Sequence, residues 1–161
     1  MSNTIVVGMA DLNIAKSGSS LITYGLGSCV GVTLYDPIHR IAGMAHVMLP
    51  DSKTYRGVVN RAKFMDTAIE ELLSRMASAG APRSVLVAKI AGGAHMFGLS
   101  PESDVIKVGL RNCEMAQLIL TKLSIPIKAN QTGGKFGRTI SIDADTGVLL
   151  IKTVGQGEQT V

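Results

Sequence analysis

The chain has 161 residues, of which 46% are hydrophobic and 17% are charged, and its formal net charge is +4. This length favours one domain spanning residues 1–161, with a core large enough to fold without a disulfide or a metal. The high hydrophobic and low charged fractions exclude a disordered chain.

Short strands dominate the first third of the chain. Apolar runs predict them at residues 4–9, 21–24, 30–35 and 41–49. The last two flank residues 36–40, where Asp, Pro and polar side chains provide turn chemistry. We therefore expect these two strands to form a hairpin.

Two helices interrupt the strands of the remaining chain. One is predicted over residues 60–79, where apolar residues recur at helical spacing before Gly80 and Pro82. A strand at 84–90 and a second helix at 111–123 follow, and then strands at 125–130, 138–143 and 148–153. This order predicts an α+β fold, in which a mixed or antiparallel β-sheet packs with two main helices.

Cysteine and histidine usage limits the chemistry. Two cysteines are too few for a disulfide scaffold, and together with three histidines they lack the spacing of a zinc site. No glycine-rich segment matches a phosphate-binding loop. We therefore expect no metal and no other cofactor.

The chain shows no sequence signal for a membrane or for nucleic acid. Its longest apolar runs are far shorter than the ~18 residues of a spanning helix, and residues 1–10 do not resemble a signal peptide. Three Tyr, three Phe and no basic stripe offer few stacking platforms for nucleic acid. We expect a cytoplasmic protein with free thiols.

Cys29 is the first candidate for chemistry. It lies in the segment Gly27-Ser28-Cys29-Val30-Gly31, whose glycines permit a sharp turn and expose backbone N–H groups that could hold an oxyanion. A buried structural cysteine is the alternative, because cysteine is among the residue types most often found in cores. Catalysis by Cys29 requires a histidine nearby in space.

The three histidines differ in their surroundings. His39 lies in the polar turn at 36–40, and His95 follows the end of a predicted strand, so a solvated or turn position suits both. His46 lies among apolar residues inside the strand predicted at 41–49. It is either a core histidine bonded to the backbone or a base.

The predicted hairpin relates Cys29 to His46. Pairing about the turn places the two residues opposite or diagonally across neighbouring strands, and directly opposite Cβ atoms lie about 5 Å apart. An imidazole at that distance can accept the thiol proton and produce a nucleophilic thiolate.

A basic stretch lies between Asp51 and Asp66, after the fourth predicted strand and extending into the start of the first predicted helix. It contains Lys53, Arg56, Arg61 and Lys63 and no acidic residue. A solvated loop is one explanation. The other is electrostatic guidance of an acidic partner.

Several segments together resemble the chemoreceptor glutamine deamidase CheD family, in order along nearly the whole chain. The segments are Leu26-Gly27-Ser28-Cys29-Val30, His46-Val47-Met48-Leu49-Pro50, Lys89-Ile90-Ala91-Gly92-Gly93-Ala94, Gly109-Leu110-Arg111-Asn112, Thr132-Gly133-Gly134, Gly137-Arg138 and Thr146-Gly147. The resemblance implies a fold similar to the deamidase domain of cytotoxic necrotizing factor toxins. It also implies conversion of selected glutamines of methyl-accepting chemotaxis receptors to glutamates.

The resemblance extends to partners. Family members act on the cytoplasmic helices of receptors and bind the CheC phosphatase, which acts on phosphorylated CheY. The alternative function is therefore a regulatory module that binds and activates that phosphatase. We expect the chain to be a monomer.

The resemblance also implies site residues. Cys29 corresponds to the family's catalytic cysteine, His46 to its histidine and Thr23 to its threonine. The physical roles that we expect are nucleophile, base and orienting group, with oxyanion donors from the backbone around Ser28 and Gly27.

The basic stretch gains a specific expectation from the resemblance. Because it closely follows Pro50, Lys53 and Arg56 are expected to lie at the rim of the site and to contact the acidic methylation helices of a receptor.

Overall fold

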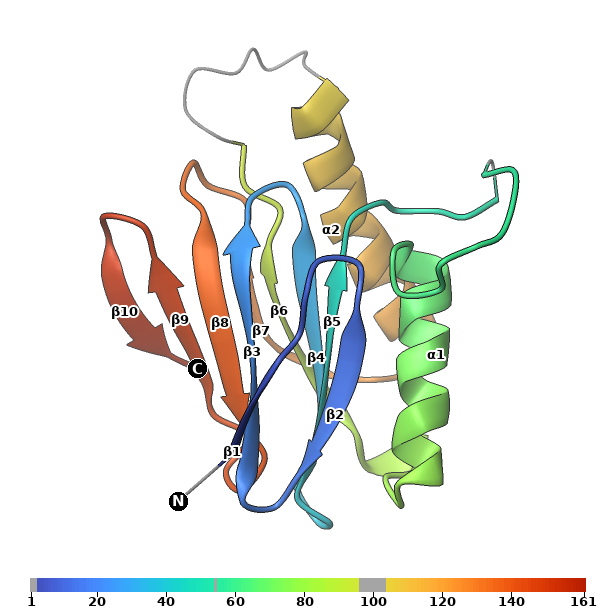
Figure 1. The fold of residues 1–161 in the computed structure, drawn as a ribbon, viewed down its shortest axis with the longest axis vertical. Coiled ribbons are helices and arrows are strands. Elements are labelled where there is room, and N and C mark those ends of the chain that lie inside the picture. The colour runs from blue at the N-terminus through green and yellow to red at the C-terminus, as the bar shows by residue number, and fades with distance from the viewer. Residues whose placement is uncertain (1–2, 54, 96–103) are drawn as a thin grey trace.

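Two five-stranded sheets and two α-helices make up the fold (Figure 1), which a computed structural model describes over residues 3–53, 55–95 and 104–161. The elements are β1 Asn3–Val6, β2 Leu12–Lys16, β3 Ser19–Leu26, β4 Val30–Asp36, β5 Ile41–Val47, α1 Met65–Ser78, the 3₁₀ turn η1 Arg83–Val85, β6 Val87–Gly92, α2 Asp104–Lys122, β7 Ile127–Thr132, β8 Arg138–Asp143, β9 Leu149–Thr153 and β10 Gly157–Thr160.

The first sheet has the strand order β1-β3-β8-β9-β10 and the second has the order β2-β5-β4-β6-β7. Both are mixed, because β1 runs parallel to β3 and β6 runs parallel to β7, while the other neighbours are antiparallel. The predicted α+β class, with mixed sheets and two helices, is confirmed. The similarity to cytotoxic necrotizing factor toxins stays a prediction.

The second sheet is the middle layer of the molecule. Helices α1 and α2 cover one of its faces and the first sheet covers the other (Figure 1). Every residue of β4 and β5 is therefore buried. Side chains such as Val32 face the helices, whereas Tyr35 and Met44 face the first sheet. Burial on both faces explains why these strands are nearly continuous apolar runs.

Helix α1 begins later than the sequence pattern predicted. Residues 60–64 are bound to the end of β5 instead, since the Lys63 carbonyl accepts the N–H groups of Met48 and Leu49. The Met65 N–H in turn donates to the Leu49 carbonyl. The segment before α1 is thereby fixed against the strand that carries His46.

Helix α2 and two strands also differ from the prediction. Helix α2 begins at Asp104 rather than at 111, with an acidic side chain in its first turn, where the helix dipole favours it. Strands β2 and β10 were not predicted. The β10 sequence Gly157–Thr160 is polar and wholly exposed, so it carries no alternating apolar signal.

Gly147 and Gly155 offer a matched test of the packing between the sheets. Their φ angles are +74° and +72°, but a Cβ at 147 would overlap the Tyr35 ring, whereas one at 155 would meet nothing within 4 Å. We expect Gly147→Ala to lower the free energy of unfolding by about 1–3 kcal/mol more than Gly155→Ala does. If urea unfolding shows equal losses of unfolding free energy for the two variants, the packing of Tyr35 against Gly147 is contradicted.

Candidate active site

Cys29 and His46 share one face of the hairpin formed by β4 and β5. In the observed register Val30 is opposite Val47 and Gly31 is opposite His46. Cys29 directly precedes β4. Extending the alternation of side chains by one residue places Cys29 on the same face as Gly31, diagonal to His46. This is the face covered by the first sheet, where Cys29 belongs to the core between the sheets.

Thr23 reaches His46 from the other sheet. Its Oγ1 lies 2.7 Å from His46 Nδ1 and also donates to the Val7 carbonyl at 2.7 Å. A hydroxyl has one hydrogen, so a Thr23 that donates to Val7 must accept from His46. His46 therefore carries its proton on Nδ1, and Nε2 presents a lone pair.

The Nε2 atom of His46 is buried and has no hydrogen-bond partner among the described residues. Burial lowers the pKa of His46 below its ordinary value, which favours the neutral ring. A neutral imidazole with an unoccupied lone pair in a dry site is suited to accept a proton.

The thiol of Cys29 is also neutral at rest. Only 7% of the residue is exposed, and burial raises the pKa of the thiol, while the Cys29 amide opposes this rise. With a raised cysteine pKa and a lowered histidine pKa, the resting pair is thiol and imidazole rather than thiolate and imidazolium. A thiol in this state becomes a nucleophile only when a base removes its proton.

The loop before Cys29 is fixed by the end of β6. Gly93 N–H donates to the Cys29 carbonyl at 2.8 Å, and Ala94 N–H donates to the Gly27 carbonyl at 2.7 Å. Gly92 has a φ of +111°, and a Cβ there would overlap the Cys29 carbonyl, so this close approach requires glycine.

Two backbone amides remain as donors beside the thiol. No backbone carbonyl among the described residues accepts the N–H groups of Ser28 and Cys29, and the Cys29 N–H lies close enough to its own thiol to interact with it. The Gly27 N–H, which we expected among the donors, is engaged by the Gly25 carbonyl at 3.0 Å. This bond limits the donor pair to Ser28 and Cys29.

Asn112 of α2 is part of the same region and was given no role by the sequence. It is fully buried, and its Nδ2 donates to the Ser28 carbonyl at 3.1 Å and to the Met48 carbonyl at 3.0 Å. A polar residue in an amphipathic helix is most simply placed on the solvated face. The Gly109-to-Asn112 segment was the only sequence signal.

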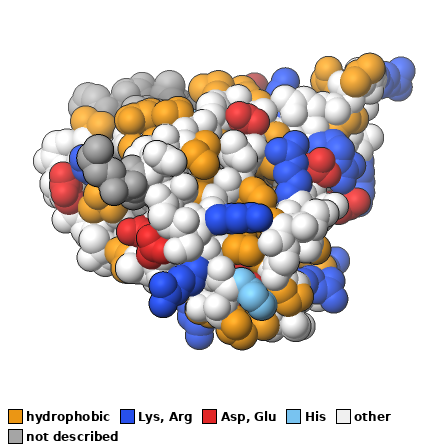
Figure 2. All heavy atoms as spheres, turned by 60° about the horizontal axis from the view of Figure 1, so that its bottom comes forward, with side chains coloured by type: hydrophobic (Ala, Val, Ile, Leu, Met, Phe, Trp, Pro, Cys, Tyr) orange, Lys and Arg blue, Asp and Glu red, His pale blue; other side chains and the backbone are white. Residues whose placement is uncertain are grey.

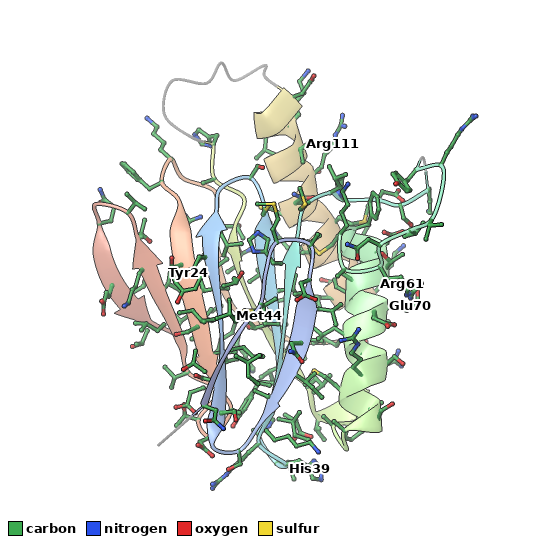
Figure 3. The ribbon with its side chains drawn as sticks, in the orientation of Figure 1. Tyr24, His39, Met44, Arg61, Glu70 and Arg111 are labelled. Carbon is green, nitrogen blue, oxygen red and sulfur yellow. The ribbon has the colours of Figure 1, made fainter. Side chains whose placement is uncertain are left out.

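The other two histidines lie elsewhere. His39 contacts Asp36 in the β4–β5 turn, with Nδ1 2.7 Å from the carboxylate, at the end of the strands opposite α2's first turns (Figure 3). His95 N–H donates to the Gly134 carbonyl, and its side chain is only partly buried.

The basic stretch divides into two pairs. Arg61 contacts Glu70 and Glu71, and Lys63 lies over aromatic rings, so both have structural partners. Lys53 and Arg56 are exposed and form no ion pair with any described residue. On the face shown in Figure 2, basic and acidic side chains are interspersed rather than gathered in a stripe.

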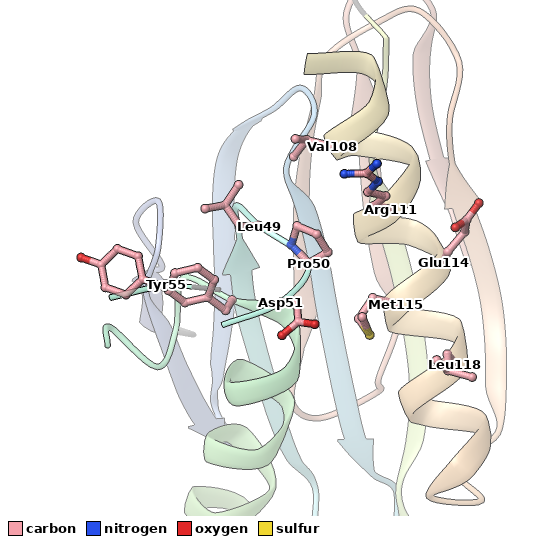
Figure 4. A pocket seen from close by; sticks show the side chains of 10 residues that line it. Leu49, Pro50, Asp51, Tyr55, Val108, Arg111, Glu114, Met115 and Leu118 are labelled. Carbon is pink, nitrogen blue, oxygen red and sulfur yellow. The ribbon is translucent and has the colours of Figure 1, made fainter. Parts of the chain in front are cut away.

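A groove of about 630 Å³ lies between the chain that follows β5, from Leu49 to Phe64, and helix α2. Figure 4 shows Leu49 and Pro50 on one side and Val108, Arg111 and Met115 of α2 on the other. The groove therefore adjoins the end of β5, close to the loop that carries the thiol.

Comparison with known proteins identifies the family. A family model described as CheD chemotactic sensory transduction matches residues 48–153. The chain belongs to the CheD family. It is 50% identical over 161 residues to the probable chemoreceptor glutamine deamidase CheD of Lachnoclostridium phytofermentans, with both proteins covered in full. It is 48% identical over 162 residues to the chemoreceptor glutamine deamidase CheD of Halalkalibacterium halodurans, also with full coverage.

The CheD family model begins just after His46, so Thr23, Cys29 and His46 precede its range, while the two relatives cover them. A crystal structure of a Neisseria meningitidis protein aligns with 83% of this chain and 63% of its own at a TM-score of 0.43 and 10% identity.

Two further features of this CheD-family chain concern metals and membranes. Within the described ranges, no three His, Cys, Asp or Glu side chains gather as metal ligands. None of the helices described here has the length and apolar content needed to cross a bilayer.

The neutral state of His46 has a consequence for stability. Burial lowers the pKa of His46, so the unfolded chain binds a proton at His46 at a higher pH than the folded chain does. Above the ordinary pKa of histidine the ring is neutral in both states, and its burial does not lower the free energy of unfolding. As the pH falls below that pKa, the unfolded chain takes up a proton first, and the folded state loses stability. We expect the urea midpoint to fall between about pH 7 and pH 5, and to fall less in His46→Gln. An equal or steeper fall in His46→Gln would contradict a buried neutral imidazole.

Proposed function

We propose that this chain is a chemoreceptor glutamine deamidase that hydrolyses selected glutamine side chains of methyl-accepting chemotaxis receptors to glutamate and ammonia. The observation that carries the proposal is the Thr23–His46 hydrogen bond, which leaves Nε2 unprotonated on the face that Cys29 shares. The names of the full-length relatives supply the reaction and the substrate class. The enzyme is thus a protein-glutamine glutaminase with a cysteine nucleophile.

The first half of the reaction forms a thioester. His46 Nε2 accepts the Cys29 proton as the sulfur attacks the side-chain carbonyl carbon of glutamine. The carbonyl oxygen becomes negatively charged and accepts hydrogen bonds from the N–H groups of Ser28 and Cys29. One well-placed donor of this kind stabilises a transition state by about 3–4 kcal/mol.

Collapse of the tetrahedral intermediate breaks the C–N bond. The imidazolium returns its proton from Nε2 to the leaving nitrogen, which departs as ammonia. A water molecule then attacks the thioester while His46 accepts its proton. Release of the glutamate side chain restores the thiol, so the cycle consumes one water and needs no redox partner.

Thr23 orients the base rather than contacting the substrate. Its hydroxyl accepts from Nδ1–H and so fixes the tautomer in which Nε2 is basic. Its own hydrogen is held by the Val7 carbonyl, which prevents the hydroxyl from donating to Nδ1 instead. This is the role of the third member of a catalytic triad.

The expected partners and location differ in how far the comparisons support them. The relatives' names support a receptor as substrate, and contact with its cytoplasmic helices belongs to the proposal. The reduced cysteines fit action in the cytoplasm. Binding of the CheC phosphatase and a monomeric state stay predictions.

The proposed roles of Cys29, His46 and Thr23 predict a graded series. Cys29→Ala and His46→Ala should abolish deamidation of a receptor fragment, because each removes an atom that takes part in the reaction. Thr23→Ala should lower kcat by about tenfold to a hundredfold, since the base loses its orientation. Mass spectrometry detects the small mass increase from amide to acid, and circular dichroism checks folding.

Two matched variants serve as controls for this series. Thr23→Ser keeps a hydroxyl and should retain most of the activity. Cys113→Ser alters the other buried thiol, which belongs to α2 and packs in the core between the helices and the second sheet, and should keep turnover within a few-fold. Full turnover in Cys29→Ala would overturn the proposal and leave the phosphatase-binding alternative.

Lys53 and Arg56 are proposed to attract the acidic surface of a receptor. Reversal of both charges, in Lys53→Glu/Arg56→Glu, should lower kcat/KM at low salt, and the difference should shrink as salt screens the charges. The control is Lys16→Glu/Lys128→Glu, which changes the net charge equally at exposed positions in β2 and β7. Equal effects of the two pairs would return residues 53–56 to the role of a solvated loop.

A further inference from the structure

Asn112 connects the two segments on which the reaction depends. Its side chain projects from α2, and its two donated hydrogen bonds end on the Ser28 and Met48 carbonyls. Ser28 directly precedes the nucleophile Cys29, and Met48 is two residues beyond the base His46. One amide group therefore joins the nucleophile segment to the base segment.

The position of this bridge in the hairpin explains its importance. The last paired residues of β4 and β5 are Val30 and Val47. Beyond them, where Cys29 leaves the ladder, no further backbone pair between the two strands is present in the described structure. The Asn112 amide supplies two hydrogen bonds at this open end. The other bonds that hold the two segments run to residues outside the hairpin, to Gly93 and Ala94 on one side and to Lys63 on the other.

Helix α2 lies close enough to hold the bridge rigid. A Cβ at Gly109, one turn before Asn112, would lie 3.6 Å from the Ser28 Cα and 3.5 Å from the Gly93 carbonyl oxygen. The helix thus packs against the nucleophile loop and against the residue whose N–H holds the Cys29 carbonyl. The loop before Cys29 is therefore held between α2 and the residues that follow β6.

The other half of the amide is unsatisfied. Asn112 Oδ1 is buried and has no hydrogen-bond partner among the described residues. An unpaired buried acceptor is destabilising, whereas the two donors of the same amide satisfy the Ser28 and Met48 carbonyls. The benefit of Asn112 lies in its two donors.

We propose that Asn112 is a positioning residue that fixes the separation of Cys29 and His46. It contacts neither substrate nor reacting atoms, and it acts through the backbone on each side of the reacting pair. Without it, the open end of the hairpin widens and proton transfer from Sγ to Nε2 becomes slower. The inference rests on the proposed function, because that function makes the pair catalytic.

The test measures Cys29 reactivity apart from deamidation. Iodoacetamide alkylates Cys29 at a rate that depends on proton loss to His46, and peptide mapping by mass spectrometry distinguishes Cys29 from Cys113. Wild type, Asn112→Ala and the isosteric Asn112→Asp are compared across pH, together with kcat and KM for a receptor fragment. Leu120→Ala, at a buried position two turns further along α2, is the matched structural control.

We expect Asn112→Ala and Asn112→Asp to lower both kcat and the rate of Cys29 alkylation near neutral pH by tenfold to a hundredfold, with KM changed less than threefold. Leu120→Ala should lower the melting temperature yet keep both rates within about twofold of wild type. Folded Asn112 variants with wild-type rates would overturn the inference. So would failure of both variants to fold while Leu120→Ala folds, because Asn112 would then serve the fold alone.

The two proposals fail in different ways. Absence of deamidation in wild type sinks the proposed function, whereas the alkylation series still reports whether Asn112 controls the reactivity of Cys29. Normal deamidation with unchanged Asn112 variants sinks the positioning role alone.

Discussion

The single hydrogen of the Thr23 hydroxyl is the constraint on which the site depends. It is given to the Val7 carbonyl, so Thr23 can only accept from His46 Nδ1, and the base is left with its lone pair on Nε2. The imidazole is thereby prepared for proton transfer without a carboxylate partner. A hydroxyl can orient a buried neutral ring and adds no charge that would have to be desolvated.

The layered fold makes this arrangement possible at a cost in stability. The second sheet is covered on both faces, so His46 and Cys29 lie where water is scarce and both are neutral at rest. An unpaired buried acceptor costs about 1–3 kcal/mol. Two atoms of this region, His46 Nε2 and Asn112 Oδ1, are buried and find no partner among the residues that the structure describes. Active sites commonly sacrifice stability in this manner, because groups prepared for a reaction are not satisfied before it.

The sequence was most informative where the relevant contact joins neighbouring strands. A short polar turn predicted the β4–β5 hairpin, which the observed register confirms. The hairpin also predicted that Cys29 lies near His46, and the pairing of Gly31 with His46 supports this. Thr23 was assigned only through family resemblance, because it lies in the other sheet and strand periodicity does not show how two sheets align. Asn112 was given no role, since a buried polar residue in a helix has the same local pattern as a solvated one. The polar edge strand β10 was missed because pairing with β9, rather than burial, makes it a strand.

The acceptor of the Thr23 hydrogen has a consequence for the chain's first residues. The Val7 carbonyl is the remote end of a chain of two hydrogen bonds that determines which ring nitrogen of His46 is protonated. The segment ahead of it is aligned beside β3, with Ile5 paired to Leu21 and Val6 to Ile22. A tag, truncation or insertion that shifts this segment by one residue would replace the Val7 carbonyl with a neighbouring carbonyl that points away from Thr23. His46 would then no longer be held with its proton on Nδ1, although the side chains of Thr23, His46 and Cys29 were all intact.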